Sequence, residues 1–126
     1  MNRAALGHHT LYDYHGCASA ALRETEKLRA AMLAGIRAAG GTIVTDTFHT
    51  FSPHGVSGVV VIAESHVTIH TWPEHNYAAV DVFSCGVKLK HAVIREAIRA
   101  ALQAERVEEK TFRRGEGISR KPTFLA

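Results

Sequence analysis

The chain has 126 residues, of which 46% are hydrophobic and 21% are charged, and its formal net charge is +3. This length suits one domain, so we expect residues 1–126 to form a single globular unit of ordinary soluble composition. No apolar run approaches the roughly 20 residues of a membrane span. The basic residues do not form a stripe interleaved with aromatic residues, which is the pattern typical of nucleic-acid binding.

The first half of the chain predicts a strand, a helix and a second strand. Leu6–Tyr14 mixes apolar and aromatic residues, as strands do, and Ser19 is a candidate helix N-cap. Apolar residues then recur at spacings of three and four from Ala20 to about Ala39, which predicts an amphipathic helix. Thr42–Phe51 is rich in β-branched and aromatic residues and predicts a strand.

The second half predicts strands in a hairpin arrangement around one more helix. Gly58–Ala63 is a continuous apolar run suited to a strand buried on both faces, and Val67–Trp72 follows almost at once. Because one strand from 58 to 72 would be unusually long, we expect a sharp bend around residues 64–66. The remaining predicted elements are a strand at Tyr77–Cys85, a helix at Leu89–Ala104 and a strand at Arg106–Arg113.

This order of elements predicts an α+β fold. Strands grouped around two amphipathic helices favour a two-layer α/β sandwich, in which an antiparallel sheet carries both helices on one face.

The period of two along a strand predicts which side chains share a face of this sheet. His66, Thr68 and His70 lie on one face, while Val67 and Ile69 face the helices. The same rule places Ala79, Asp81, Phe83 and Cys85 together on the next strand. His70 and Cys85 can therefore lie on one side of the sheet, where Ser57 can join them. Taken alone, such residues are more often structural than catalytic.

Nine histidines and two cysteines also raise the question of a metal site. The sequence has no CxxC or HExxH motif, and the pair His66 and His70 has no obvious third ligand, so we expect no metal. Cys17 and Cys85 are far apart in sequence; a single disulfide between them is possible, but two free thiols in a reducing compartment fit better, and the cytoplasm is the default.

The block from Phe48 to Gly86 resembles the bacterial and archaeal S-adenosylmethionine decarboxylase family. The matching motifs, in chain order, are Gly-Val-Ser57-Gly, Glu64-Ser65-His-x-Thr-Ile-His70-Thr-Trp-Pro-Glu74 and Asp81-x-Phe-x-Cys85-Gly86. They cover about a third of the chain almost without a gap, and their order and spacing are highly specific. The opening Leu6-Gly7-His8-His9 also resembles the family.

The resemblance implies that the chain is a proenzyme that cuts itself between Glu64 and Ser65. The products are a β chain, residues 1–64, and an α chain, residues 65–126. Attack of the Ser65 hydroxyl on the Glu64 carbonyl exchanges the amide for an ester, and elimination and hydrolysis then leave a covalent pyruvoyl group at residue 65. His70 is the expected base in this processing, and Ser57 would support its intermediate by hydrogen bonding.

The resemblance further implies a pyruvoyl-dependent decarboxylase that acts on S-adenosylmethionine in polyamine biosynthesis. The pyruvoyl ketone forms a Schiff base with the substrate and serves as the electron sink. Cys85 is the expected proton donor to the product carbon. Glu74 matches the carboxylate that binds the ribose hydroxyls, and Phe51 matches the residue that stacks on adenine. The family pairs two copies of the cleaved protomer, so we expect a homodimer.

One departure from the family pattern leaves alternatives open. The segment Val87-Lys88-Leu89-Lys90 lacks the acidic stretch and the Asp-Pro found in many relatives. This difference leaves the substrate open, because related pyruvoyl enzymes decarboxylate arginine or ornithine. Retention of Glu74 and Phe51 favours S-adenosylmethionine. A non-cleaving pseudoenzyme that regulates an active partner is a further alternative, against which the presence of Ser57, Ser65, His70 and Cys85 argues.

Overall fold

The computed structural model describes residues 5–63, 65–86 and 88–118. Within them the strands are β1 (Gly7–His15), β2 (Ile43–Thr50), β3 (Val56–Ile62), β4 (Ser65–Trp72), β5 (Tyr77–Cys85) and β6 (Arg106–Arg114). The helices are the short η1 (Ala21–Arg23) and η2 (Pro73–His75) and the longer α1 (Thr25–Ala38) and α2 (His91–Leu102).

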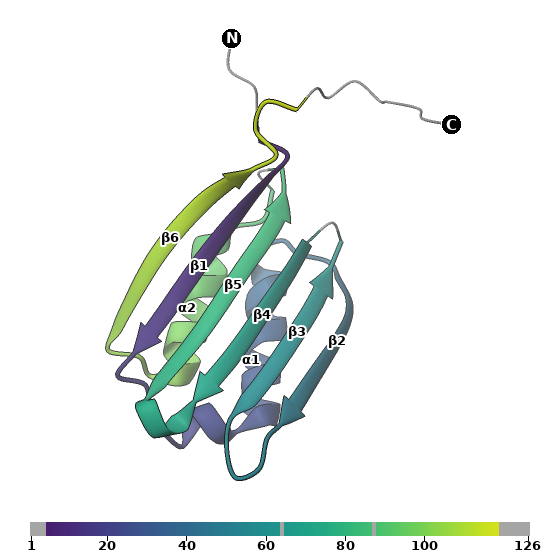
Figure 1. Ribbon diagram of the computed structural model, residues 1–126. Helices are drawn as coiled ribbons and strands as arrows, with labels where there is room; N and C mark the ends of the chain where they lie inside the picture. The colour runs from purple at the N-terminus through teal and green to yellow at the C-terminus, as the bar shows by residue number, and fades with distance from the viewer. Residues whose placement is uncertain (1–4, 64, 87, 119–126) are drawn as a thin grey trace.

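The strands form one sheet in the order β2-β3-β4-β5-β1-β6, and every neighbouring pair is antiparallel. Both α-helices cover the same face of this sheet, side by side, as Figure 1 shows. The predicted two-layer α+β sandwich is therefore confirmed. The face without helices is called the open face, and it carries Ser57, His70 and Asp81 among the residues that the sequence singled out.

Alternation along the strands builds the core on the helix side. Val60, Val67 and Ile69 are fully buried there, against apolar side chains of both helices. The helix residues in this cluster include Leu28, Met32 and Ile36 from α1 and Ile94, Ile98 and Leu102 from α2. Burial of each such side chain stabilises the fold by about 1.5–3 kcal/mol. Since these residues must therefore face the helices, the period of two along each strand fixes which of its residues point to the open face.

The first helix begins later than the N-cap prediction at Ser19. Residues Ala21–Arg23 form the 3-10 turn η1, and α1 starts only at Thr25. The Leu22 side chain is fully buried, and its carbonyl accepts a hydrogen bond from the Thr71 hydroxyl at 2.8 Å. This contact with the end of β4 replaces a regular first helical turn, since tertiary packing overrides local preference.

Glycines allow α1 to end and to pack closely against α2. Gly40, with φ +94°, follows α1, and the Gly41 N–H donates to the Ile36 carbonyl at 2.8 Å. A Cβ at Gly35 would lie 2.7 Å from the Ala97 Cβ, so glycine is needed where α1 approaches α2. None of the described helices is long and apolar enough to cross a membrane.

Within one copy of the chain, the expectation that Gly58–Ala63 is buried on both faces is wrong. Val60 and Ile62 are buried on the helix side, but Val59 and Val61 are 41% and 39% exposed on the open face. The apolar run could not reveal this because it lacks the alternation of polar residues that marks an uncovered face.

Candidate active site

Ser57 and His70 are directly opposite each other on β3 and β4. The Ser57 Oγ and the His70 Nδ1 are 2.7 Å apart, which is hydrogen-bond distance. Both side chains point to the open face because their neighbours Val56, Gly58, Ile69 and Thr71 are buried on the helix side. The predicted gathering of Ser57 and His70 on one face is thus observed.

Phe51 and Glu74 belong to the same end of the sheet as this pair. Phe51 follows β2, and its N–H donates to the Gly55 carbonyl at 2.9 Å across the turn into β3. Its ring is 48% exposed. Glu74 lies in η2 just after β4, with its Oε1 3.2 Å from the Nε2 of His54. This end of the sheet, with Phe51, Ser57, His70 and Glu74, is the Ser57 end.

Ser65 lies at the opposite end, at the first position of β4. It is paired with Ile62 on β3 and with Ser84 on β5, and its hydroxyl donates to the Ala63 carbonyl at 3.3 Å. β3 ends at Ile62 and β4 begins at Ser65, so the connection between the two paired strands is tight, and Ser65 and His66, which the prediction placed in a bend, already belong to β4. Glu64, the other residue of the predicted cleavage site, lies outside the described residues.

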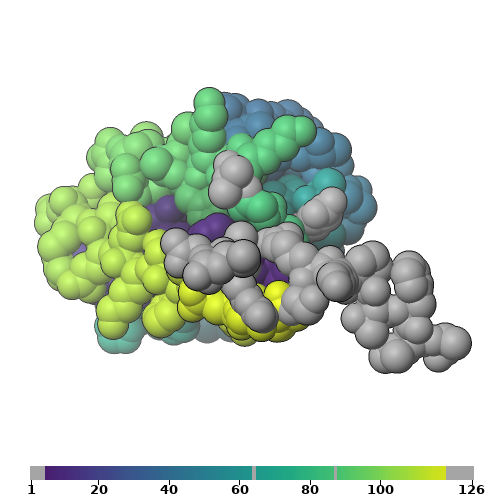
Figure 2. Space-filling view, turned by 90° about the horizontal axis from the view of Figure 1, so that it is seen from above, coloured from purple at the N-terminus to yellow at the C-terminus, as the bar shows by residue number. Residues whose placement is uncertain are grey.

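Cys85 is beside Ser65, because it directly follows Ser84, the Ser65 partner on β5. Cys85 is exposed. Together with Ser65 and Lys88 it lines a pocket of about 200 Å³. This is the Ser65 end of the sheet. Figure 2 shows the molecule from this end, with blue and green residues of the helix layer on one side and yellow β6 on the other.

One copy of the chain does not bring the two ends together. His70 is five positions after Ser65 on the same strand, which is about 16 Å at the usual rise of ~3.3 Å per residue. Figure 1 shows the turn from β2 to β3 and η2 at one end, and the start of β4 and the end of β5 at the other. Within one chain, His70 cannot reach the Ser65 α-proton, and Cys85 lies at the Ser65 end, away from Ser57.

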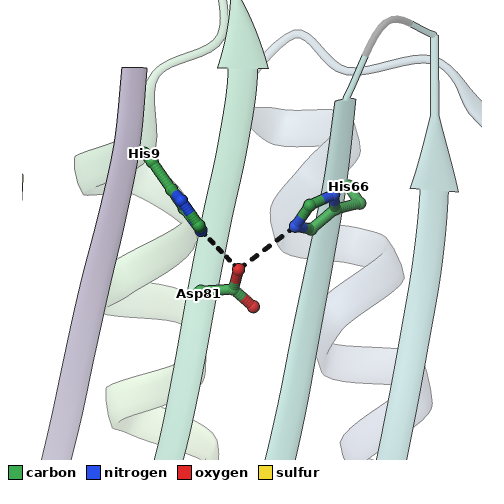
Figure 3. Close-up of side chains that lie close together, drawn as sticks. All are labelled: His9, His66 and Asp81. Carbon is green, nitrogen blue, oxygen red and sulfur yellow. Dashed lines mark hydrogen bonds and ion pairs between the residues drawn. The ribbon is translucent and has the colours of Figure 1, made fainter. Parts of the chain in front are cut away.

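A third group of polar side chains joins β1, β5 and β4 on the open face. The Asp81 Oδ2 is 2.6 Å from the His9 Nε2 and 3.1 Å from the His66 Nε2 (Figure 3). The Thr68 hydroxyl donates to the other carboxylate oxygen. Burial acts to raise the pKa of Asp81, but the hydrogen bonds from Thr68, His9 and His66 outweigh it and hold the pKa below its usual value.

Sequence reasoning did not identify His9 as part of this group, nor Asp81 as the residue that joins two histidines. His9 and His66 are both opposite Phe83, one from each side, so the strand order places them around β5. The side-chain alternation of each strand was readable from the sequence. That β1 returns to pair with β5 was not, because this contact joins residues 72 positions apart.

A partly buried network on the helix side supports the strand segment that carries Cys85. The His91 ring, at the start of α2, has its Nε2 2.7 Å from the Ser84 Oγ and its Nδ1 2.9 Å from the Thr10 Oγ1. Burial lowers the pKa of His91. These residues line a pocket of about 300 Å³ between the sheet and α2. It lies on the other side of the sheet from the Ser57–His70 pair.

The two thiols are unpaired, as predicted, but their surroundings differ. Cys17 is buried, its Sγ is 3.6 Å from the Tyr14 carbonyl oxygen, and burial raises its pKa to about 11. Cys85 is exposed. Only Cys85 is therefore accessible to a small molecule.

Comparisons with known sequences agree with the motifs. Residues 8–115 match the family model described as S-adenosylmethionine decarboxylase. The chain is 45% identical over 112 residues to the S-adenosylmethionine decarboxylase proenzyme of Acidithiobacillus ferrooxidans, a match that covers 89% of this chain and 84% of that one. It is 44% identical over 111 residues to the proenzyme of Thermotoga maritima, covering 88% and 85% of the two chains.

Comparisons with solved structures give the same result. The adenosylmethionine decarboxylase of Aquifex aeolicus superposes with a TM-score of 0.84 at 31% identity, covering 97% of this chain and all (100%) of that one. A Trypanosoma brucei AdoMetDC monomer matches with a TM-score of 0.61 at 13% identity, over 81% of this chain and 44% of that one. At that identity the second likeness concerns the fold alone.

Proposed function

The chain belongs to the S-adenosylmethionine decarboxylase family, and we propose that it removes the carboxyl group of S-adenosylmethionine as carbon dioxide. The product, S-adenosylmethioninamine, is an aminopropyl donor for spermidine, so the reaction belongs to polyamine biosynthesis. One observation carries this proposal. Ser65 and Cys85, which the family motifs assign to cleavage and protonation, lie on neighbouring strands and line one pocket.

The active form arises by self-cleavage between Glu64 and Ser65, which yields chains of residues 1–64 and 65–126. The Ser65 oxygen attacks the Glu64 carbonyl carbon, and the peptide C–N bond breaks as the ester C–O bond forms. Removal of the Ser65 α-proton then expels the Glu64 carboxylate, and hydrolysis of the dehydroalanine releases ammonia. The tight β3–β4 connection supports this step, since it limits how far the reacting groups can move apart.

A pyruvoyl group formed from Ser65 fits the surroundings of that residue. Ser65 is partly exposed at the start of β4, beside the pocket of about 200 Å³, so the group would face open space and not a packed core. Its ketone would supply the electron sink that decarboxylation of an α-amino acid requires. The β4–β5 pairing would hold the chain end in place, and the Cys85 thiol would deliver a proton to the product carbon.

The complete site needs a homodimer of cleaved protomers. If two open faces pack with their strands reversed, the Ser57 end of one copy meets the Ser65 end of the other. His70 and Ser57 of the second copy can then serve Ser65 of the first, which one copy alone does not allow. The open face also exposes the apolar side chains Leu11, Val59, Val61, Trp72 and Phe112, at 38–48% of their full exposure, and a second sheet would cover them.

The Ser57 end also carries the groups that would recognise the nucleoside part of the substrate. Glu74 is partly exposed and offers two carboxylate oxygens, which suit a ribose diol. The exposed ring of Phe51 offers a stacking surface for adenine. Neither feature is required for a small substrate such as arginine or ornithine, so both favour S-adenosylmethionine.

We place the enzyme in the cytoplasm, where the unpaired Cys17 and Cys85 thiols remain reduced. Intact-mass measurement of the denatured, reduced protein tests the proposed function first. We expect two chains split between Glu64 and Ser65, with no free amine on the C-terminal one. The cleaved protein should release carbon dioxide from carboxyl-labelled S-adenosylmethionine but not from arginine or ornithine. A single chain that never matures on incubation would refute the proposal and favour a pseudoenzyme.

A further inference from the structure

The residue that directly follows Ser65 is held by its side chain as well as by its backbone. His66 is paired with Val61 on β3 and Phe83 on β5. Its Nε2 is 3.1 Å from the Asp81 Oδ2, and its ring packs against Phe83 with the ring centres 5.7 Å apart. Figure 3 shows the imidazoles of His9 and His66 approaching one carboxylate from the two neighbouring strands.

The three side chains have the composition of a metal site, but a fourth residue favours a hydrogen-bonded network. The Arg114 guanidinium is 3.1 Å from the His9 Nδ1 and can only donate. The His9 Nδ1 is therefore the acceptor, and its Nε2 carries the proton that is donated to Asp81. A metal ligand would need that same Nε2 without its proton. The ionised Asp81 carboxylate likewise accepts from the His66 Nε2 and from the Thr68 hydroxyl.

Self-cleavage makes such a network useful. Before the cut, β4 is continuous with β3, and after it β4 begins at a chain end. Chain ends fray unless they are tied down, because few contacts oppose their motion. The group that the proposed reaction needs would be at this end, and His66 is the first residue beyond it.

We propose that Asp81 is a positioning residue that anchors the newly formed chain end through His66. This inference rests on the proposed function, since it assumes the cut and the decarboxylation. Asp81 and Cys85 lie four positions apart on the same face of β5. The bond from Asp81 to His66 therefore fixes the distance between the start of β4, where the new chain end lies, and the thiol that donates the proton. His9 and Thr68 hold the carboxylate in place, and Arg114 holds His9.

Hydrogen exchange on the cleaved protein tests the anchor without reference to activity. In Asp81→Asn we expect the first amides of the C-terminal chain, those of residues 66–68, to exchange at least about tenfold faster than in the wild type. Exchange in α2 should not change. Asp46→Asn is the matched control, because Asp46 is also a partly buried carboxylate on a strand, paired with Arg29 at 2.6 Å and remote from β4. Equal exchange at residues 66–68 in Asp81→Asn and the wild type would overturn the anchor.

Steady-state kinetics give the second readout. A displaced chain end should lower kcat for S-adenosylmethionine roughly 10- to 100-fold, with KM changed less than about 3-fold, because geometry and not substrate affinity is altered. His66→Phe keeps a ring against Phe83 but removes the N–H donor, and it should reproduce the effect. This variant also tests the anchor if Asp81→Asn does not fold. The double variant should lose no more than either single one.

The failure of this inference is distinguishable from the failure of the proposed function. If the wild type is cleaved and active but both variants keep wild-type kcat and exchange, only the anchor is wrong. If a stoichiometric divalent metal co-purifies with the wild type and is lost from Asp81→Asn, the group is a metal centre and the hydrogen-bonded anchor is also wrong. A wild type that is neither cleaved nor active would refute the proposed function itself.

Discussion

The Ser57 hydroxyl and the His70 imidazole lie across from each other on β3 and β4, with Oγ and Nδ1 2.7 Å apart. Both are on the open face, but His70 is about 16 Å along β4 from Ser65, the residue whose chemistry it is predicted to assist. To act on Ser65 as proposed, the pair must therefore come from a second copy of the chain.

His70→Ala should accumulate the uncut precursor. Loss of a positioned base lowers the rate of a proton-transfer step roughly 10²- to 10⁴-fold, so maturation should slow by a similar factor. The measurement is a time course of intact mass after purification. His75→Ala, which removes an exposed imidazole from η2, is the control and should mature normally. Normal maturation of His70→Ala would remove His70 from the processing chemistry.

Mixing two inactive variants tests whether each site is shared between copies. Ser65→Ala lacks the cleavable serine, and His70→Ala lacks the base, so each homodimer should remain uncut. A heterodimer has one site in which Ser65 from the His70→Ala copy meets His70 from the Ser65→Ala copy. Co-expression should therefore cut only the His70→Ala chain and restore about a quarter of wild-type activity under random pairing.

If the two variants carry tags of different mass, their chains can be distinguished by intact mass, so the copy that is cut can be identified directly. Absence of any cleavage in a demonstrated heterodimer would mean that each site is built within one chain. The reversed-strand pairing of the open faces would then be wrong.

Cys85→Ala should separate cleavage from decarboxylation. Since Cys85 is expected to act only on the product carbon, the variant should still be cut between Glu64 and Ser65. Its kcat for S-adenosylmethionine should fall roughly 10²-fold, as expected when a positioned proton donor is removed. Cys17→Ala provides the comparison, because that thiol is buried and should not affect kcat. Equal kcat in Cys85→Ala and the wild type would exclude Cys85 as the donor.

His91 should make the stability of the fold depend on pH. Its pKa is lowered in the folded state by burial, so below about pH 6.5 the unfolded state takes up a proton that the folded state resists. The free energy of unfolding should fall as the pH drops from about 6.5 toward the lower folded pKa. Above pH 6.5 this contribution is constant, because the imidazole is neutral in both states.

Urea unfolding at several pH values between 5 and 8 measures this effect. Both proteins should carry Ser65→Ala, so that a single uncut chain unfolds in each case. The His91→Gln variant should lose less stability on acidification than its parent does. Parallel pH profiles for the two proteins would show that another group is responsible.

The sequence by itself determined the elements and the chemistry along the chain. Period-two alternation placed Val67 and Ile69 toward the helices and His66, Thr68 and His70 away from them, because strand geometry leaves no other choice once one face is buried. The motifs around Ser57, Ser65, His70 and Cys85 identified the family. Such local rules depend only on residues that are near one another in sequence.

Only the tertiary structure decided which of these residues meet. Strand order brought His9 from β1 to Asp81 and His66, and strand length kept His70 away from Ser65. Tertiary packing, through the contact between Leu22 and Thr71, also moved the start of the helix from the predicted Ala20 to Thr25. Contacts of this kind join residues distant in sequence, and they form because the whole sheet and its helices must bury a common core. No local pattern contains that information.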